Sequence, residues 1–190
     1  MIAVILHFFE WLFGSAPRKD AATPVEDAPY RLHIPRTLIR ELREMTQPNG
    51  EHGEPLAFLL ARFASEDSRG ILVGIAALTF ADAAYVDGPA GANFDTSWAV
   101  QVANEQITSN IGLLLVHSHG GSGIPMFSGI DQQTNRTVMG ALAVGIKTVP
   151  YGAMVLSDTD ARCVIAVSRE LKSVAVVVVP DRFGGMQVTV

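Results

Sequence analysis

Hydrophobic residues occur in short runs that are separated by segments rich in glycine, proline and charged residues. Short apolar runs bounded by such turn residues are typical of buried β-strands. The runs at 151–156, 161–167 and 173–179 are also rich in β-branched residues, which favour strands. We therefore predict strands at residues 30–34, 56–63, 71–80, 111–116, 151–156, 161–167, 173–179 and 186–190.

Three helices are predicted among these strands. The first begins at Pro35, a residue that suits the first helical position, and ends at Thr46. Its apolar residues, spaced to share one helical face, are Leu38, Ile39, Leu42 and Met45. A second helix is expected to be capped by Asp95 or Thr96 and to bury Trp98, Val102 and Ile107, and a third is expected over residues 132–142. Because strands and helices mix without a regular alternating repeat, we predict an α+β fold with a central mixed β-sheet flanked by helices.

The chain divides into three parts. Residues 1–14 are apolar except for two positions, and we expect an N-terminal helix there. This segment is too short to cross a bilayer, which takes about 20 residues. It either packs on its own domain or contacts a membrane or a partner through residues 1–13. Residues 15–29 form a linker rich in alanine, proline and charge, and residues 30–190 form one domain.

The composition narrows the classes of function. Hydrophobic residues make up 48% of the 190 positions and charged residues 17%, which permits a sizeable core and argues against global disorder. The formal net charge is −5 and no long basic run occurs, so nucleic-acid binding is not expected. Cys163 is the only cysteine and lies in an apolar run, so we expect a buried thiol, no internal disulfide and a cytoplasmic location.

The strongest chemical signal follows the apolar run at 111–116. His117 and His119 are two residues apart at the end of a strand, so both imidazoles leave the same face of the sheet. A loop with several glycines follows, and then Ser128 and Asp131 stand three apart, on one face of the helix that they open. Two imidazoles and one carboxylate form a three-ligand zinc set that leaves the fourth position open for water, the catalytic pattern.

Each half of this pattern also has a structural interpretation. Ser-x-x-Asp before a helix resembles a capping box, although glutamate or glutamine is the usual partner of the serine. The two histidines could simply be surface residues at the end of a strand, without a ligand. Finding two histidines, a glycine loop, a serine and an aspartate within fifteen residues favours one common explanation, which is a metal ion.

These residues resemble the signature of the JAB/MPN (JAMM) zinc metallopeptidases, in which His-x-His is followed by Ser-x-x-Asp. The resemblance extends over about residues 32–179, with one more residue between His119 and Ser128 than the commonest family spacing. The loop glycines and the residues after Asp131 are most similar to the bacterial branch, whose members are encoded beside ubiquitin-activating and ubiquitin-conjugating-like enzymes. The resemblance implies a JAB/MPN-like fold with cytidine-deaminase-like layering.

The resemblance also implies a reaction and its residues. The chain would be a zinc-dependent, deubiquitinase-like protease that hydrolyses the amide or isopeptide bond after a ubiquitin-like protein. His117, His119 and Asp131 would bind Zn²⁺, and Ser128 would support the oxyanion. The general base of the family is an upstream glutamate at the first strand after the first helix, and Glu54 stands there, with Glu51 and Glu66 as competitors.

Three other functions fit parts of the pattern. Two histidines and a carboxylate also form the facial triad of non-haem iron oxygenases, but Ser128 would then have no role. A DNA-repair-associated JAB-like protein carries a similar motif, although the acidic balance of this chain disfavours that function. A non-catalytic MPN scaffold is the third alternative, but such scaffolds usually lack the metal ligands that are present here.

Overall fold

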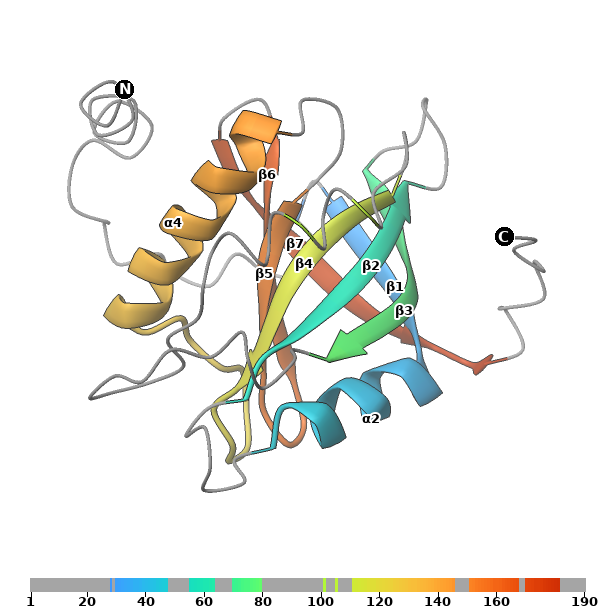
Figure 1. Cartoon of the computed structure of the whole chain (residues 1–190). Coiled ribbons are helices and arrows are strands. Elements are labelled where there is room, and N and C mark those ends of the chain that lie inside the picture. Colours follow the sequence, from blue (N-terminus) through green and yellow to red (C-terminus); the bar gives the residue numbers. More distant parts are fainter. Residues whose placement is uncertain are drawn as a thin grey trace.

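The computed structural model describes residues 28, 30–47, 55–63, 70–79, 101, 105, 111–145, 151–167 and 170–181. Its helices and strands are shown in Figure 1. In chain order they are β1 (Tyr30–Pro35), α2 (Arg36–Met45), β2 (Ala57–Phe63), β3 (Ile71–Thr79), β4 (Ile111–Ser118), α4 (Gly129–Gly145), β5 (Tyr151–Leu156), β6 (Ala161–Val167) and β7 (Glu170–Val179). Among the described residues, no helix is long and apolar enough to cross a membrane.

The seven strands form one closed barrel in the order β1-β3-β2-β4-β5-β6-β7. β1 pairs in parallel with both β3 and β7, and β4 pairs in parallel with β5. The other neighbouring strands are antiparallel. These directions place the carboxyl ends of β4, β5 and β7 at the same end of the barrel as the amino ends of β2 and β6. Figure 1 shows α2 across this end, which we call the α2 end.

The main core lies between α2 and one face of the strands. Alternate strand residues such as Leu114 and Val116 point to this face and are almost fully buried. Helix α2 contributes its apolar stripe, in which Leu38, Ile39 and Leu42 are all buried. The fit is close at Gly74 of β3, where an added Cβ would lie 3.3 Å from Leu38 Cδ2. Helix α2 is therefore part of the core, which the barrel strands otherwise supply.

His117 lies on the opposite face of β4, which points away from the main core. Leu113, Leu115 and His117 alternate with the core residues and are themselves buried. Helix α4 packs against β5, the parallel neighbour of β4, and Figure 1 shows it along the outside of the barrel. Two apolar α4 residues, Val138 and Met139, are buried, and so are the polar residues Asp131 and Asn135. The end of β4 and the start of α4 can therefore face each other outside the main core.

The predicted fold class, a central mixed sheet flanked by helices in JAB/MPN-like or cytidine-deaminase-like layers, is wrong. The strands are mixed in direction, but they close into a seven-stranded barrel with two short helices among the described elements. Closure comes from the pairing of β1 with β7, in which Tyr30 lies opposite Val174. The hydrophobic pattern of each strand is satisfied in an open or a closed sheet, so it could not show this pairing.

Several predictions concern residues that the structure does not describe. The helix over residues 1–14, the linker over residues 15–29 apart from Ala28, and the strand over residues 186–190 lie outside the described ranges. So do Glu51, Glu54 and Glu66. The helix predicted after Asp95 or Thr96 also lies outside these ranges, apart from Gln101 and Glu105, which are helical. These assignments remain predictions.

Candidate metal centre

The two histidines stand at the α2 end of the barrel, where β4 stops. His117 is the last but one residue of β4, and its side chain is only 5% exposed. His119 follows the strand, and its backbone N–H donates to the carbonyl oxygen of Leu156 at 3.0 Å. This bond keeps the chain extended for one residue beyond β4, so the two imidazoles share a face, as predicted. The His119 side chain is 24% exposed and is therefore open to solvent on one side.

Asp131 lies in the first turn of α4, opposite the histidines. Its carboxylate accepts a hydrogen bond from the backbone N–H of Ser128, while its own N–H donates to Ser128 Oγ at 3.1 Å. These two bonds form a reciprocal cap at the start of the helix. The capping interpretation of Ser128 and Asp131 is thus correct, and the cap also holds the carboxylate toward the strand.

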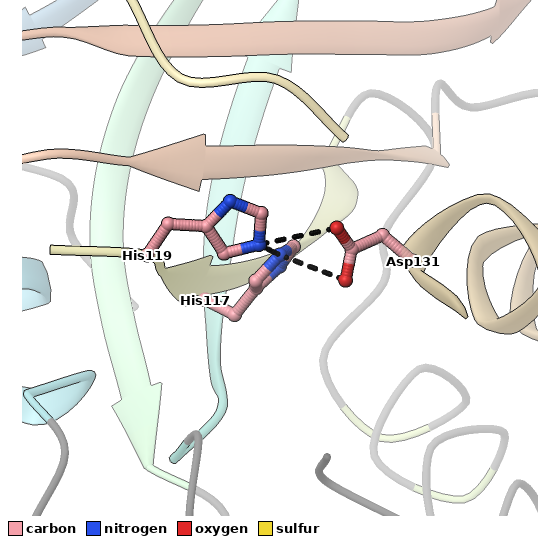
Figure 2. A group of neighbouring side chains, drawn as sticks. All are labelled: His117, His119 and Asp131. Atoms are coloured by element: carbon pink, nitrogen blue, oxygen red, sulfur yellow. Dashed lines mark hydrogen bonds and ion pairs between the residues drawn. The ribbon is translucent and has the colours of Figure 1, made fainter. Parts of the chain in front are cut away.

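Figure 2 shows the three side chains converging, with the carboxylate of Asp131 facing both imidazoles. His117 Nε2 lies 3.2 Å from Asp131 Oδ1, and His119 Nε2 lies 3.1 Å from Asp131 Oδ2. The two Nε2 atoms are 3.1 Å apart. A possible ligand atom from each residue lies within 4.8 Å of the others. The structure therefore brings together the three residues predicted as ligands.

This arrangement fits a zinc ion by both chemistry and size. Imidazole nitrogen and carboxylate oxygen bind Zn²⁺ at about 2.0–2.2 Å, so neighbouring ligands of a tetrahedral zinc lie about 3.3 Å apart. The separations of 3.1–3.2 Å between the three side chains are close to that value. Three ligands leave one tetrahedral position, and the partial exposure of His119 marks the side from which water could reach it.

The electrostatics of Asp131 also suit a cation. Burial alone would raise the pKa of its carboxyl group, but the hydrogen bond and charge of His117 and the bonds from Ser128 outweigh burial. The pKa of Asp131 is therefore held well below its usual range, and the group is a carboxylate at neutral pH. The N-terminal end of α4 favours the same negative charge through its dipole.

A glycine-containing loop, residues 120–128, connects the two halves of the centre. Gly121 and Gly123 have φ angles of 76° and 91°, in a region that residues with a Cβ rarely adopt. No atom lies within 4 Å of an added Cβ at either glycine, so backbone conformation and not crowding requires them. The glycines noted in the sequence thus form the sharp turns between strand and helix.

The proposed general base lies outside the described residues, but the strand that follows it is described. Ala57, the first residue of β2, pairs with Val116, directly before His117. At its other end β2 pairs Arg62 with Ile111, far along β4 from the histidines. Glu54 precedes the end of β2 that lies beside the centre, whereas Glu66 follows the distant end.

One contributor to the centre was not identified from the sequence. The turn formed by residues 157–160, between β5 and β6, is hydrogen-bonded to the loop at Gly121 and Gly123. Polar residues between two strands indicate a turn, but no sequence signal indicated which loop the turn would contact.

A cavity of about 170 Å³ borders this turn and is lined by Ile124, Thr159 and residues of α2, β6 and β7. None of the three candidate ligands lines it.

Sequence comparisons with protein families and curated proteins identified no related protein. No protein-family model matches this chain, and no similar sequence was found among curated proteins. The resemblance to the JAMM metallopeptidases therefore depends on the motif residues themselves, and the geometry of the centre is the observation on which a function can be argued.

Proposed function

We propose that this protein is a zinc-dependent protease of the JAMM type that hydrolyses the amide or isopeptide bond after a ubiquitin-like protein. The observation that carries this proposal is the convergence of His117, His119 and Asp131, with ligand atoms 3.1–3.2 Å apart, at the end of β4. Three ligands with one open position are typical of catalytic zinc, whereas structural zinc usually has four protein ligands.

The residues divide the chemistry between them. His117, His119 and Asp131 would hold Zn²⁺, which supplies a Lewis acid and lowers the pKa of a bound water to about 7. The cap with Ser128 fixes Asp131, so the carboxylate does not have to be ordered when the ion binds. The buried environment of His117 limits its motion in the same way.

Glu54 would act as the general base that takes a proton from water and delivers it to the leaving amine. A base must come within hydrogen-bond reach of the reacting water, about 2.6–3.2 Å. The pairing of Ala57 with Val116 supports Glu54 over Glu66, because only the amino end of β2 lies at the histidine end of β4.

Ser128 would stabilise the oxyanion of the tetrahedral intermediate. Its Oγ accepts a hydrogen bond from the N–H of Asp131 at 3.1 Å. Accepting this bond uses a lone pair and leaves the hydroxyl proton to be donated elsewhere. The residue is exposed, and it sits one helical turn from a proposed zinc ligand, where a substrate carbonyl would be polarised.

The surface around the centre supports a protein as the substrate. Three large apolar side chains, Ile124, Met126 and Ile130, are exposed on the loop and the first turn of α4. Large apolar side chains that stay exposed close in sequence to a candidate site are consistent with a protein-binding surface. We propose a ubiquitin-like protein and its conjugates as partners, with activating and conjugating enzymes of the same system, in the cytoplasm.

The proposal is tested by incubating purified protein with linear fusions of candidate ubiquitin-like proteins. We expect cleavage directly after the ubiquitin-like part, loss of cleavage with a zinc chelator, and recovery when Zn²⁺ is returned. The His119→Ala variant, purified in parallel, should be inactive. A wild-type protein that binds zinc but cleaves no fusion would favour a non-catalytic scaffold, and bound iron in place of zinc would favour an oxygenase.

A further inference from the structure

The loop between the two halves of the metal centre is held by a turn from another part of the barrel. Ser157 Oγ donates a hydrogen bond to the carbonyl oxygen of Gly123 at 2.7 Å. The N–H of Gly123 donates to Thr159 Oγ1 at 2.9 Å, and the N–H of Asp158 donates to the carbonyl oxygen of Gly121 at 2.8 Å. Both backbone polar groups of Gly123 are therefore bonded to the turn.

Ser157 is the central residue of this arrangement. It is only 3% exposed, and its Oγ also accepts a hydrogen bond from the N–H of Asp160 at 2.9 Å. Its carbonyl oxygen accepts a hydrogen bond from Nε of Arg43 on α2 at 3.0 Å. Ser157 thus links the loop, its own turn and the helix that completes the core.

The loop needs such an external tether. Its glycines provide the required turns, but glycine also has the largest backbone freedom to lose when a conformation is fixed. His119 precedes the loop and Asp131 follows it, so movement of the loop changes the distance between a strand ligand and the helix ligand. The backbone bond from His119 to Leu156, next to Ser157, ties the start of the loop to the same strand end.

We propose that Ser157 is a positioning residue for the metal centre, which fixes residues 120–128 so that His119 and Asp131 are held at the spacing that a metal ion needs. Thr159 would assist through the N–H of Gly123. This inference rests on the metal centre of the proposed function, but it concerns the affinity for the ion and not the substrate.

The test measures zinc affinity by competition with a chromophoric chelator, together with hydrogen exchange of residues 120–128. Ser157→Ala should weaken zinc binding by about 10- to 100-fold, the usual scale for outer-shell partners of a metal site. It should also speed exchange in the loop. Ser157→Thr, which keeps a hydroxyl, should restore most of the affinity, and Thr159→Ala should weaken binding less than Ser157→Ala.

Thr137→Ala on α4 is the control, since it removes an exposed hydroxyl that donates to the carbonyl oxygen of Gln133 within its own helix, and it should leave zinc affinity unchanged. If Ser157→Ala does not fold, the exposed position Thr159 carries the test through the same two measurements. Wild-type affinity in Ser157→Ala, or in Thr159→Ala if only that variant folds, would overturn the inference. A wild-type protein that binds zinc without cleaving any fusion would contradict the proposed function and leave this inference standing.

Discussion

The two described helices, α2 and α4, begin in different ways. α2 follows Pro35, which makes no side-chain hydrogen bond to the helix. Its first turn is instead capped by a residue that follows β7. Asp181 Oδ1 accepts hydrogen bonds of 2.8 Å from both the backbone N–H and Oγ1 of Thr37. α4 is capped by its own neighbours, because Ser128 and Asp131 bond each other reciprocally.

This difference shows how one carboxylate can serve both the fold and the chemistry. The cap of α2 fastens residues after β7 to the helix, and no candidate ligand takes part in it. The cap of α4 leaves the oxygens of Asp131 facing two imidazoles at 3.1 and 3.2 Å. Capping and metal ligation are therefore compatible at Asp131, and the two roles can be separated by substitution.

The largest effect is expected from Asp131→Asn. The amide can still accept the hydrogen bond from Ser128, so the helix cap and the fold should persist, while the loss of charge removes a strong zinc ligand. We expect zinc affinity to fall by more than about 100-fold, beyond the usual effect of an outer-shell change. Chelator competition measures the affinity, and circular dichroism checks the fold.

Ser128→Ala is the converse control, because it removes the Oγ that caps Asp131 and keeps the carboxylate. It should retain zinc and lose about 0.5–2 kcal/mol of stability, as for other N-cap replacements. If Asp131→Asn bound zinc as tightly as wild type, the carboxylate would be a cap alone.

A second large effect should follow from removing the proposed base without altering either helix. Glu54→Gln should keep zinc and lose at least about 10²-fold in the rate of fusion cleavage, the usual scale for a positioned base. Glu51→Gln and Glu66→Gln should change the rate little. The turnover of the three variants is compared at equal zinc content, and an active Glu54→Gln with an inactive Glu66→Gln would make the assignment wrong.

A moderate effect on stability alone is expected at α2. Leu42 is fully buried in the core, so Leu42→Ala should lower the free energy of unfolding by about 2–5 kcal/mol. Glu44→Ala, an exposed change on the same helix, should alter it by less than about 0.5 kcal/mol. Urea unfolding measures both. Zinc affinity of the folded Leu42→Ala protein should match wild type, and a large loss would show that α2 controls the metal centre.

The smallest effect is expected from Asp181→Ala. Two hydrogen bonds hold the pKa of Asp181 below its usual range: the larger effect comes from the N–H of Thr37 and the smaller from the Thr37 hydroxyl group. Because this pKa is lowered in the folded protein, the stabilisation is present at neutral pH and is lost as the pH falls through the folded-state pKa. Asp181→Ala should therefore lower Tm slightly at pH 7 and less in acid. A difference in Tm that grows in acid would contradict this linkage.

The elements could be predicted from the sequence better than their arrangement. Predicted strands at 30–34, 56–63 and 71–80 agree within one residue at each end with β1, β2 and β3. The last described strand began three residues earlier than predicted, at Glu170. Apolar runs reveal strands because burial of alternate or successive residues is a local property. Pairing of β1 with β7 joins residues more than 140 positions apart, and no local pattern encodes it.

The candidate centre was predictable for a different reason. His117 and His119 share a strand end, and Ser128 and Asp131 share the first turn of a helix, so each pair is placed by local geometry. The sequence could not show that the turn at Ser157 holds the loop between these pairs. That contact depends on the parallel pairing of β4 with β5, which brings Ser118 opposite Leu156.

The most direct test of the account is the metal content of the protein as purified, without added metal. We predict one zinc per chain by elemental analysis, with loss of zinc in both His117→Ala and His119→Ala. His33→Ala on β1 is the control and should keep its zinc, because His33 lies in a strand that is not adjacent to β4. Full zinc in both histidine variants, or no zinc in the folded wild-type protein, would contradict the metal centre.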